Sequence, residues 1–299
     1  MTCYAPVDAF RTPTGVVFSE LRRHDIVGPI KLPCGQCIGC RMRRASDWEL
    51  RVMHEASLHD VSCFVTLTYG RDKLPPDGGL CHRDFQLFMK RVRRELGPVR
   101  FYMCGEYGPL NLRPHYHACL FGVDFRSDRV VSGKSAAGAV FYDSPTLARL
   151  WSHGRVSVQD LSRETASYCA RYIMKKVLGD GAATAYQRVR ESGEVVRVAP
   201  EYAAMSLKPG IGAGWYNRFR SDVFPVDYVV AGGVRRRVPR YYDKLLQRSG
   251  SVVKDEIEFK RAEAARAHVE DQSPERLRVR EVVENARVAN LKRDAGWES

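Results

Sequence analysis

The sequence predicts an α+β fold with a mainly antiparallel sheet. Runs of β-branched and aromatic residues, typical of strands, are interleaved with runs that have the apolar spacing of helices. The links between several of these runs are short enough for hairpins, which favours antiparallel pairing. The chain has 299 residues, of which 44% are hydrophobic and 28% charged, as expected for one large globular domain or two modest ones.

The first expected elements follow residues 1–40, which look irregular because they are rich in Pro, Gly and turn residues. Residues 41–58 mix apolar side chains with Arg and Glu at helical spacing. Residues 62–69 form a β-branched and aromatic run and predict a strand. Residues 82–96 predict an amphipathic helix with one basic side. Its apolar side consists of Phe85, Phe88, Met89 and Val92.

The next two strands are expected at residues 99–104 and 115–123, on either side of a turn that contains Gly and Pro. Residues 145–151 predict a short helix, residues 155–158 a short strand and residues 162–178 a longer helix.

The remainder of the chain is less regular. Residues 182–250 have a mixed pattern, and the tail from Lys254 onward is charge-dense and helical, with a break near Ser273 and Pro274.

Charge is distributed unevenly along the chain. Lys and Arg number 48 against 35 Asp and Glu, a net charge of +13, yet residues 254–299 carry 10 basic and 11 acidic side chains. The positive charge therefore lies in the first 253 residues, which indicates a polyanionic partner such as nucleic acid. The alternative is a solvated basic surface. No run approaches the roughly 20 apolar residues of a membrane helix, and the N-terminus lacks a secretory signal, so we expect a soluble intracellular protein.

The nine cysteines are an odd number, which argues against a disulfide framework. Cys34, Cys37 and Cys40 form two successive CxxC steps in a glycine-containing loop, a spacing that can turn thiolates toward one point. A structural zinc ion needs four ligands. The fourth could be Cys3, Cys63, Cys81 or His54, of which we favour Cys3, and the alternative is a loop of reduced cysteines whose glycines serve turn geometry. Cys104, Cys119 and Cys169 lie in apolar stretches and are expected in the core.

His115 and His117 are two residues apart on a predicted strand, so both face one side of the sheet while Tyr116 faces the other. Glu106 ends the preceding strand, and hairpin pairing would bring it beside the two histidines. Two imidazoles and one carboxylate leave coordination positions open, as a catalytic Mn²⁺ or Mg²⁺ requires. The alternative is one core histidine and one solvated histidine.

Tyr168 and Tyr172 are i and i+4 in the predicted helix 162–178 and share one face, with Lys175 near it and Ser162 as the N-cap. A tyrosine hydroxyl has a pKa of about 10 and needs assistance to act as a nucleophile. A metal ion bound to a phosphodiester could polarise the phosphorus, and a lysine could neutralise the phosphate or the phenolate. Attack by tyrosine would give a 5′-phosphotyrosine link and a free 3′-OH, and two tyrosines would permit two transfers. The alternative is a pair of amphipathic tyrosines at the edge of the core.

In these features the chain resembles the HUH endonucleases, the rolling-circle replication initiators. The family's motifs occur in its chain order: Phe64-Val-Thr-Leu-Thr-Tyr69, then Arg113-Pro-His-Tyr-His117 with Glu106 in place of the third ligand, then Tyr168-xxx-Tyr172-xx-Lys175. The chain is similar, more narrowly, to the initiators of the microviruses of the gokushovirus type. That similarity rests on Pro33-Cys-Gly-Gln-Cys-Ile-Gly-Cys-Arg41, Trp48, His54-Glu-Ala56, Met205-Ser-Leu-Lys-Pro-Gly-Ile-Gly212 and Trp215.

The resemblance implies a five-stranded antiparallel sheet flanked by helices. It implies metal ligation by Glu106, His115 and His117, nucleophilic attack by Tyr168 and Tyr172, and an assisting cation at Lys175. The implied reaction is site-specific nicking and rejoining of single-stranded DNA at the viral origin. Host helicase and DNA polymerase are the implied partners, and the host bacterial cytoplasm is the implied location.

Arginines and one further lysine are candidate phosphate contacts for single-stranded DNA. The candidates are Arg91, Arg93, Arg94, Arg113, Arg171, Lys176 and residues 235–237, each of which could equally be a plain surface charge.

We divide the chain into four parts: a Cys-rich loop and helix (1–60), an HUH nuclease core (61–180), a mixed extension packed on the core (181–250) and a charged helical tail (251–299). Three alternatives for the function stay open: a plasmid- or transposon-type HUH nuclease, a non-catalytic metal-containing protein that binds single-stranded nucleic acid, and a zinc-dependent hydrolase that uses the histidine pair.

Overall fold

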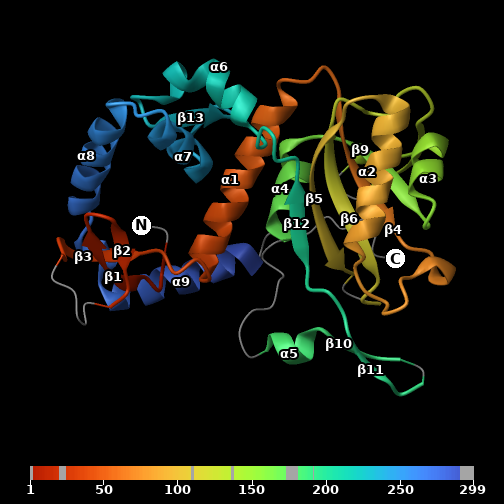
Figure 1. Cartoon of the computed structure of the whole chain (residues 1–299), viewed down its shortest axis with the longest axis horizontal. Coiled ribbons are helices and arrows are strands. Elements are labelled where there is room, and N and C mark those ends of the chain that lie inside the picture. Colours follow the sequence, from red (N-terminus) through yellow and green to blue (C-terminus); the bar gives the residue numbers. More distant parts are fainter. Residues whose placement is uncertain are drawn as a thin grey trace. The chain divides into compact units, whose positions relative to one another are not determined.

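The computed structural model describes residues 3–19, 25–108, 111–135, 138–172, 181–190 and 192–289. Within these residues the chain forms two compact units (Figure 1). The smaller unit combines the beginning of the chain, up to residue 44, with the segment that starts at residue 250, and the larger unit spans residues 45–249. The two units are described separately.

The larger unit is built on a seven-stranded sheet in which every neighbouring pair is antiparallel (Figure 1). The strand order is β12-β5-β6-β4-β9-β8-β7. The strands are β4 (Ser62–Thr68), β5 (Arg100–Tyr107), β6 (Pro114–Phe121), β7 (Val130–Lys134), β8 (Val140–Asp143), β9 (Val156–Asp160) and β12 (Tyr202–Met205). The predicted α+β class with a mainly antiparallel sheet is therefore confirmed.

The expected count of five strands is wrong for this sheet. The strands that the sequence pattern misses are β7, β8 and β12, which lie at or near the two edges of the sheet. Strands β7 and β8 form a hairpin in which β7 is almost wholly exposed, and β12 is a strand of 4 residues. Exposed or short edge strands lack the apolar alternation from which a strand is recognised.

Side chains alternate across the inner strands and divide the core into two clusters. Cys63, Val65 and Leu67 of β4 belong to one cluster, and Phe64 between them belongs to the other. The first cluster is covered by α2 (His82–Leu96) and α3 (Pro145–Trp151). The second is covered by α4 (Arg163–Arg171) and by α1 (Ile38–Ala56) from residue 45 onward, and Figure 1 shows α2 and α4 on opposite faces of the sheet.

Several predicted elements have the bounds that the sequence indicates. Helices α2 and α3 begin and end at the predicted residues, and the four apolar residues expected on one side of α2 are all buried. Ser162 caps α4 through a capping box in which Thr165 N donates to its hydroxyl and Thr165 Oγ1 accepts from its backbone NH. The described part of this helix ends within the predicted range of residues 162–178.

The mixed stretch after α4 adds short elements to the larger unit. Two separate hairpins, β10-β11 and β13-β14, accompany two further helices, α6 and α7. The elements are η1 (Arg71–Lys73), α5 (Ala182–Ala185), β10 (Gln187–Val189), β11 (Val195–Arg197), α6 (Ala213–Val223), β13 (Tyr228–Ala231), β14 (Val234–Arg237) and α7 (Arg240–Arg248).

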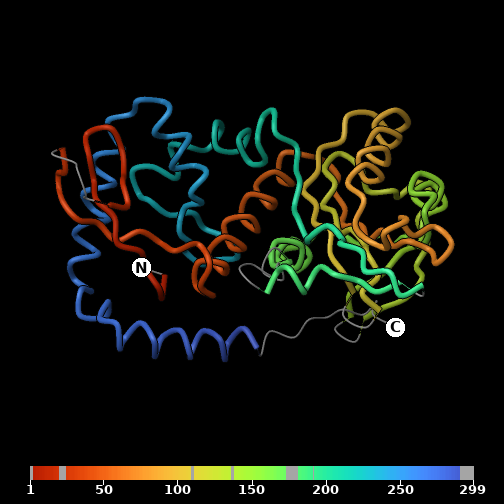
Figure 2. Tube along the Cα trace, turned by 60° about the horizontal axis from the view of Figure 1, so that its bottom comes forward, coloured from red at the N-terminus to blue at the C-terminus, as the bar shows by residue number. Residues whose placement is uncertain are grey.

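The smaller unit brings the two ends of the chain together, and both views show its N-terminal strands beside its C-terminal helices (Figure 1, Figure 2). Residues 1–40 are not irregular as expected, because three short strands pair there in the order β2-β1-β3. These strands bury few apolar side chains, which is why no period marks them in the sequence. The elements are β1 (Val7–Thr12), β2 (Gly15–Val17), β3 (Gly28–Leu32), α8 (Val253–Arg266), η3 (Glu270–Gln272) and α9 (Pro274–Ala289).

The break expected in the C-terminal tail is confirmed, since α9 begins at Pro274 after the short turn η3. Among the described residues, no helix combines the length and the apolar character that a membrane span requires.

Candidate active site

The register of strands β5 and β6 brings three metal-binding side chains together. Glu106 lies directly opposite His115, and His117 lies opposite Cys104. Since β5 continues to Tyr107, Glu106 lies within the strand and not at its end. Its backbone is therefore held by the ladder on the same face of the sheet as both histidines.

Both imidazoles point at one carboxylate oxygen. The Nε2 atoms of His115 and His117 lie 2.7 Å and 3.0 Å from Glu106 Oε1. The side chain of Glu106 is completely buried and that of His117 nearly so. The three residues thus form a converging set of two nitrogens and one oxygen whose ligand atoms all lie within 4.8 Å of one another.

The second nitrogen of each ring is also engaged. His115 Nδ1 donates to the backbone carbonyl of Arg113 over 3.1 Å, which leaves the Nε2 lone pair of the neutral ring aimed at the carboxylate. His117 Nδ1 is hydrogen-bonded to Thr66 Oγ1 at 3.0 Å. Metal-binding histidines commonly have such a partner on the other nitrogen, because it fixes the ring orientation and the tautomer.

This arrangement fits a divalent cation. Two neutral imidazole nitrogens and a carboxylate oxygen are all electron-rich, so they converge favourably only around a proton or a cation. Burial alone would raise the pKa of Glu106, but the hydrogen bonds and the charges of the two histidines hold it well below its usual value. The carboxylate is therefore ionised, and with three protein ligands the set leaves coordination positions for a substrate.

The two tyrosines of α4 lie against this centre. Tyr172 stacks on His117 with ring centroids 5.1 Å apart and an interplanar angle of 12°. Tyr168 meets the same imidazole edge-on at 5.1 Å and meets Tyr172 edge-on at 4.5 Å. Small buried residues on α4, Ala166 and Ala170 with Cys169, allow the helix to approach the sheet this closely.

The two tyrosines differ in their exposure. Tyr172 is 5% exposed, whereas Tyr168 is half-buried. Burial raises the pKa of Tyr172 far above its usual value, and the nearby charge of Glu106 adds to this effect. Its phenol is therefore neutral in this arrangement.

Sequence reasoning did not single out Phe64 and Thr66, which complete the site. Phe64 stacks on His117 at 5.6 Å, on the side of the sheet that α4 covers, and Thr66 holds the second nitrogen of that ring. The available signal was alternation in β4, which places residues 64 and 66 on one face, together with the register that pairs Thr66 with His117.

The candidate DNA contacts are dispersed. Arg113 and Arg171 are half-buried and adjoin the site, the first through its carbonyl on His115 and the second as the neighbour of Tyr172 in the chain. Lys175 and Lys176 lie outside the described residues. By contrast, Arg91 and Arg93 project from α2 on the other face of the sheet and donate to the carbonyls of Leu150 and Val99.

Arg94 is exposed on the same helix α2. In the 235–237 run, Arg236 is hydrogen-bonded to Ser46 Oγ and Arg235 lies over the ring of Tyr228.

The four cysteines named as zinc ligands also converge. The sulfur atoms of Cys3, Cys34, Cys37 and Cys40 lie within 4.8 Å of one another in the smaller unit. Cys104, Cys119 and Cys169 are buried in the core of the larger unit, as predicted.

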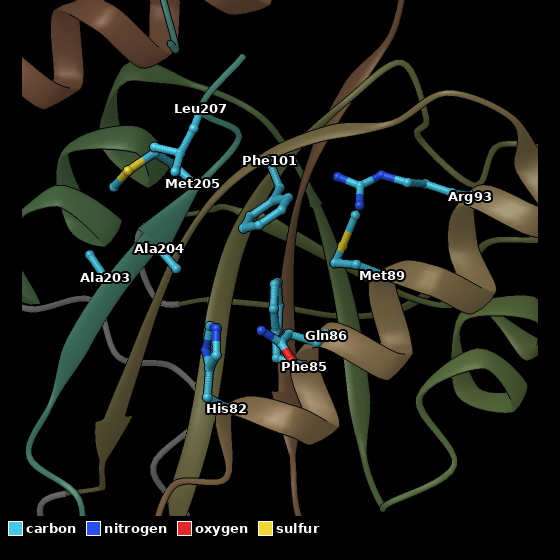
Figure 3. A pocket seen from close by; sticks show the side chains of 10 residues that line it. All are labelled: His82, Phe85, Gln86, Met89, Arg93, Phe101, Ala203, Ala204, Met205 and Leu207. Atoms are coloured by element: carbon cyan, nitrogen blue, oxygen red, sulfur yellow. The ribbon is translucent and has the colours of Figure 1, made fainter. Parts of the chain in front are cut away.

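A pocket of about 450 Å³ lies away from the metal-binding side chains (Figure 3). It opens between α2 and the strands β5 and β12, with Phe85, Met89 and Phe101 toward the core and His82 and Arg93 at its rim. Since α2 covers the face opposite to α4, this pocket does not belong to the candidate active site.

Comparison with known proteins agrees with this geometry. Residues 62–177 match the family model of the replication-associated protein ORF2, a segment that contains Glu106, both histidines and both tyrosines. The replication-associated protein VP4 of Bdellovibrio phage phiMH2K is 31% identical over 255 residues, which cover 81% of this chain and 76% of that protein. The chain belongs to the microvirus family of replication-associated proteins.

Two further relatives extend this family match beyond the segment of the family model. The replication-associated protein ORF2 of Spiroplasma virus 4 is 29% identical, over 73% of this chain and 68% of that protein. The replication-associated protein ORF4 of Chlamydia phage 1 is 27% identical, over 76% of this chain and 56% of that protein. No solved structure matches the chain significantly.

Proposed function

We propose that this protein initiates rolling-circle replication of phage DNA by nicking and rejoining one strand as an HUH endonuclease does. The observation that carries the proposal is the contact of both tyrosine rings with His117, whose Nε2 shares the Glu106 oxygen with His115. A nucleophile and a set of metal ligands are thereby adjacent on facing elements. Membership in a family of replication-associated proteins supports the same conclusion.

Glu106, His115 and His117 would hold the metal ion, and Mg²⁺ and Mn²⁺ are the candidates for this nitrogen and oxygen donor set. A bound divalent cation would polarise the scissile phosphodiester and stabilise the leaving oxygen. The chain's own contribution is to keep the three ligands oriented. Arg113 provides the carbonyl that orients His115, and Thr66 provides the hydroxyl that orients His117.

The nicking step is a transesterification. The hydroxyl oxygen of one tyrosine attacks the phosphorus, a bond forms between them, and the bond from phosphorus to the 3′ oxygen breaks. The phenol loses its proton, and the departing 3′ oxygen gains one. The products are a 5′-phosphotyrosine and a free 3′-OH that a host polymerase could extend while a host helicase displaces the strand.

The second tyrosine would serve the end of the cycle. While the first tyrosine holds the 5′ end, the second can cut the regenerated origin, and the new 3′-OH can attack the first phosphotyrosine to close the displaced strand. The phosphotyrosine link retains the energy of the broken phosphodiester, so rejoining needs no nucleotide cofactor. Lys175 would neutralise the phosphate or phenolate, and Arg113, Arg171 and Lys176 would bind neighbouring phosphates.

The proposal is tested by an adduct assay. End-labelled single-stranded circles and linear strands of the phage genome are mixed with the protein and Mg²⁺, Mn²⁺ or EDTA, and denaturing gels are examined for DNA that migrates with protein. We expect a metal-dependent adduct that is lost in the Tyr168→Phe/Tyr172→Phe double variant. A Tyr142→Phe variant, changed at a half-buried tyrosine outside the site, should form the adduct normally.

The other outcomes distinguish the alternatives. Cleavage without an adduct would identify a metal-dependent hydrolase that uses the histidine pair. Tight binding without cleavage or adduct would identify a DNA-binding protein without catalysis. An adduct formed only on plasmid or transposon ends would move the protein to another HUH class.

A further inference from the structure

Four cysteines in the smaller unit form a cluster that the proposed nicking reaction does not use. Cys3 precedes β1, whereas Cys34, Cys37 and Cys40 lie at the junction between β3 and α1. Residues 31 or more positions apart in the chain are thus brought to one point. All four sulfur atoms lie within 4.8 Å of one another, and Cys3 and Cys40 are buried.

The distances between sulfur atoms match those of a tetrahedral metal site. Cys3 Sγ lies 3.6 Å from Cys34 Sγ and 3.9 Å from Cys37 Sγ. Four sulfurs at the usual Zn–S distance of about 2.3 Å form a tetrahedron whose edges are about 3.8 Å long. A disulfide requires about 2.05 Å between the sulfurs, and all four cysteines are free thiols.

Backbone amides surround the cluster and favour thiolates. Cys3 Sγ accepts from the NH of Cys34 at 3.2 Å, and Cys37 Sγ accepts from the NH of Tyr4 at 3.3 Å. Cys34 Sγ accepts from the NH groups of Gln36 and Cys37 at 3.4 Å and 3.3 Å. The thiolate is the form that binds metal, and amide donors of this kind stabilise it.

The smaller unit also lacks a core of its own. Both hydrophobic clusters among the described residues consist of residues from the larger unit. In the described part of the smaller unit, the buried apolar side chains are Cys3, Ala9, Cys40, Ile257 and Leu277. A unit with so little buried apolar surface usually needs a metal ion or a disulfide for stability.

We propose that Cys3, Cys34, Cys37 and Cys40 bind one structural zinc ion. Four protein ligands would fill the tetrahedral coordination of zinc and leave no position for a substrate, so the site stabilises the fold and does not react. The ion would tie the beginning of the chain to the junction between β3 and α1. This inference is independent of the nicking reaction.

The first experiment measures zinc by mass spectrometry in protein purified under reducing conditions. The background is a His115→Ala/His117→Ala variant, in which the other candidate metal site cannot contribute. We expect about one zinc ion per chain, retained when Cys81 is changed to Ser and lost when Cys37 is changed to Ser. Cys81 is a half-buried free cysteine outside the cluster and serves as the matched control.

The second experiment does not depend on a variant that folds. Cobalt is exchanged for zinc in the full wild-type chain, and the absorption spectrum is recorded. Intense thiolate-to-cobalt charge-transfer bands together with tetrahedral d–d bands would support the proposal, because the Glu106 site has no sulfur ligand. Four free thiols without bound metal, or an intact mass about 2 Da lower that indicates a disulfide among these cysteines, would overturn it.

Discussion

The imidazole of His117 stacks on the ring of Tyr172, with centroids 5.1 Å apart and planes inclined by 12°. One residue belongs to the central strand β6 and the other ends the described part of α4. The contact fixes the distance between the candidate metal ligands and the candidate nucleophile through the packing of a helix on a sheet. A change in either element therefore affects both parts of the proposed reaction.

The two tyrosines are expected to be unequal in the first cleavage. Tyr168 is half-buried, whereas Tyr172 is 5% exposed and has a pKa raised by burial. We expect Tyr168→Phe to slow adduct formation on a linear origin strand by more than about tenfold, because the remaining nucleophile is a buried phenol. Tyr172→Phe should form the first adduct at nearly the normal rate and fail to circularise the displaced strand. Single-turnover adduct assays measure both effects, and equal losses in the two variants would contradict this order.

Thr66 is expected to act as a positioning residue for metal binding. Its hydroxyl is hydrogen-bonded to His117 Nδ1, and without that partner the ring loses its fixed orientation. Loss of such a partner typically weakens metal binding by about 10–100-fold, so we expect Thr66→Val to raise the dissociation constant for Mn²⁺ by that factor. Titration calorimetry on the DNA-free protein provides the measurement.

The matched control for Thr66 is Thr68→Val on the same strand. Thr68 lies opposite His115 in the ladder and faces the same side of the sheet. It should bind Mn²⁺ as the wild type does. Equal weakening in both variants would show that the strand, and not the hydroxyl of Thr66, determines the affinity.

Much of the candidate site could be predicted because its residues depend on local periods. Alternation in a strand put His115 and His117 on one face, and a short hairpin put Glu106 near them. Helical spacing put Tyr168 and Tyr172 together on α4. What these periods could not provide was the contact between α4 and β6, which depends on non-local packing.

The remaining parts of the fold lacked such periods. The smaller unit joins residues near both ends of the chain, and its short strands bury little, so neither its sheet nor its composition could be predicted. Strand β12 pairs with β5 across about a hundred residues of intervening chain, which no local pattern reports.

Glu55 is expected to be a major contributor to the stability of the larger unit. Its buried carboxylate accepts from Arg100 Nε at 2.5 Å and from the NH of Gly212 at 2.7 Å. Two of the sequence segments that mark the microvirus group, residues 54–56 and 205–212, thus meet at one carboxylate. We expect Glu55→Ala to lower the free energy of unfolding by about 3–5 kcal/mol, because it leaves a partly buried arginine and a buried amide unpaired.

Urea denaturation followed by tryptophan fluorescence measures this loss. The control is Glu258→Ala, which removes an exposed partner of Lys254 and should cost less than about 1 kcal/mol. A loss in Glu55→Ala no larger than that of the control would show that the Glu55 contacts do not stabilise the unit.

His54 is expected to make stability depend on pH. It is buried beneath Trp215, with ring centroids 3.6 Å apart, and its Nδ1 is hydrogen-bonded to the hydroxyl of Tyr242 at 2.8 Å. Burial lowers the pKa of His54 from 6.5 to about 4. Between these two values the unfolded chain takes up a proton at His54 and the folded chain does not, so the free energy of unfolding falls as the pH falls.

The size of this effect follows from the shift, which corresponds to at most about 3 kcal/mol lost between pH 6.5 and pH 4. We therefore expect the stability difference between the wild type and His54→Phe to be constant above pH 7 and to shrink by about that amount at pH 4. Urea denaturation at a series of pH values measures it, with exposed His268→Phe as a control that keeps the wild-type pH profile. Parallel profiles for the wild type and His54→Phe would mean that His54 titrates equally in the folded and unfolded chains, which its burial beneath Trp215 argues against.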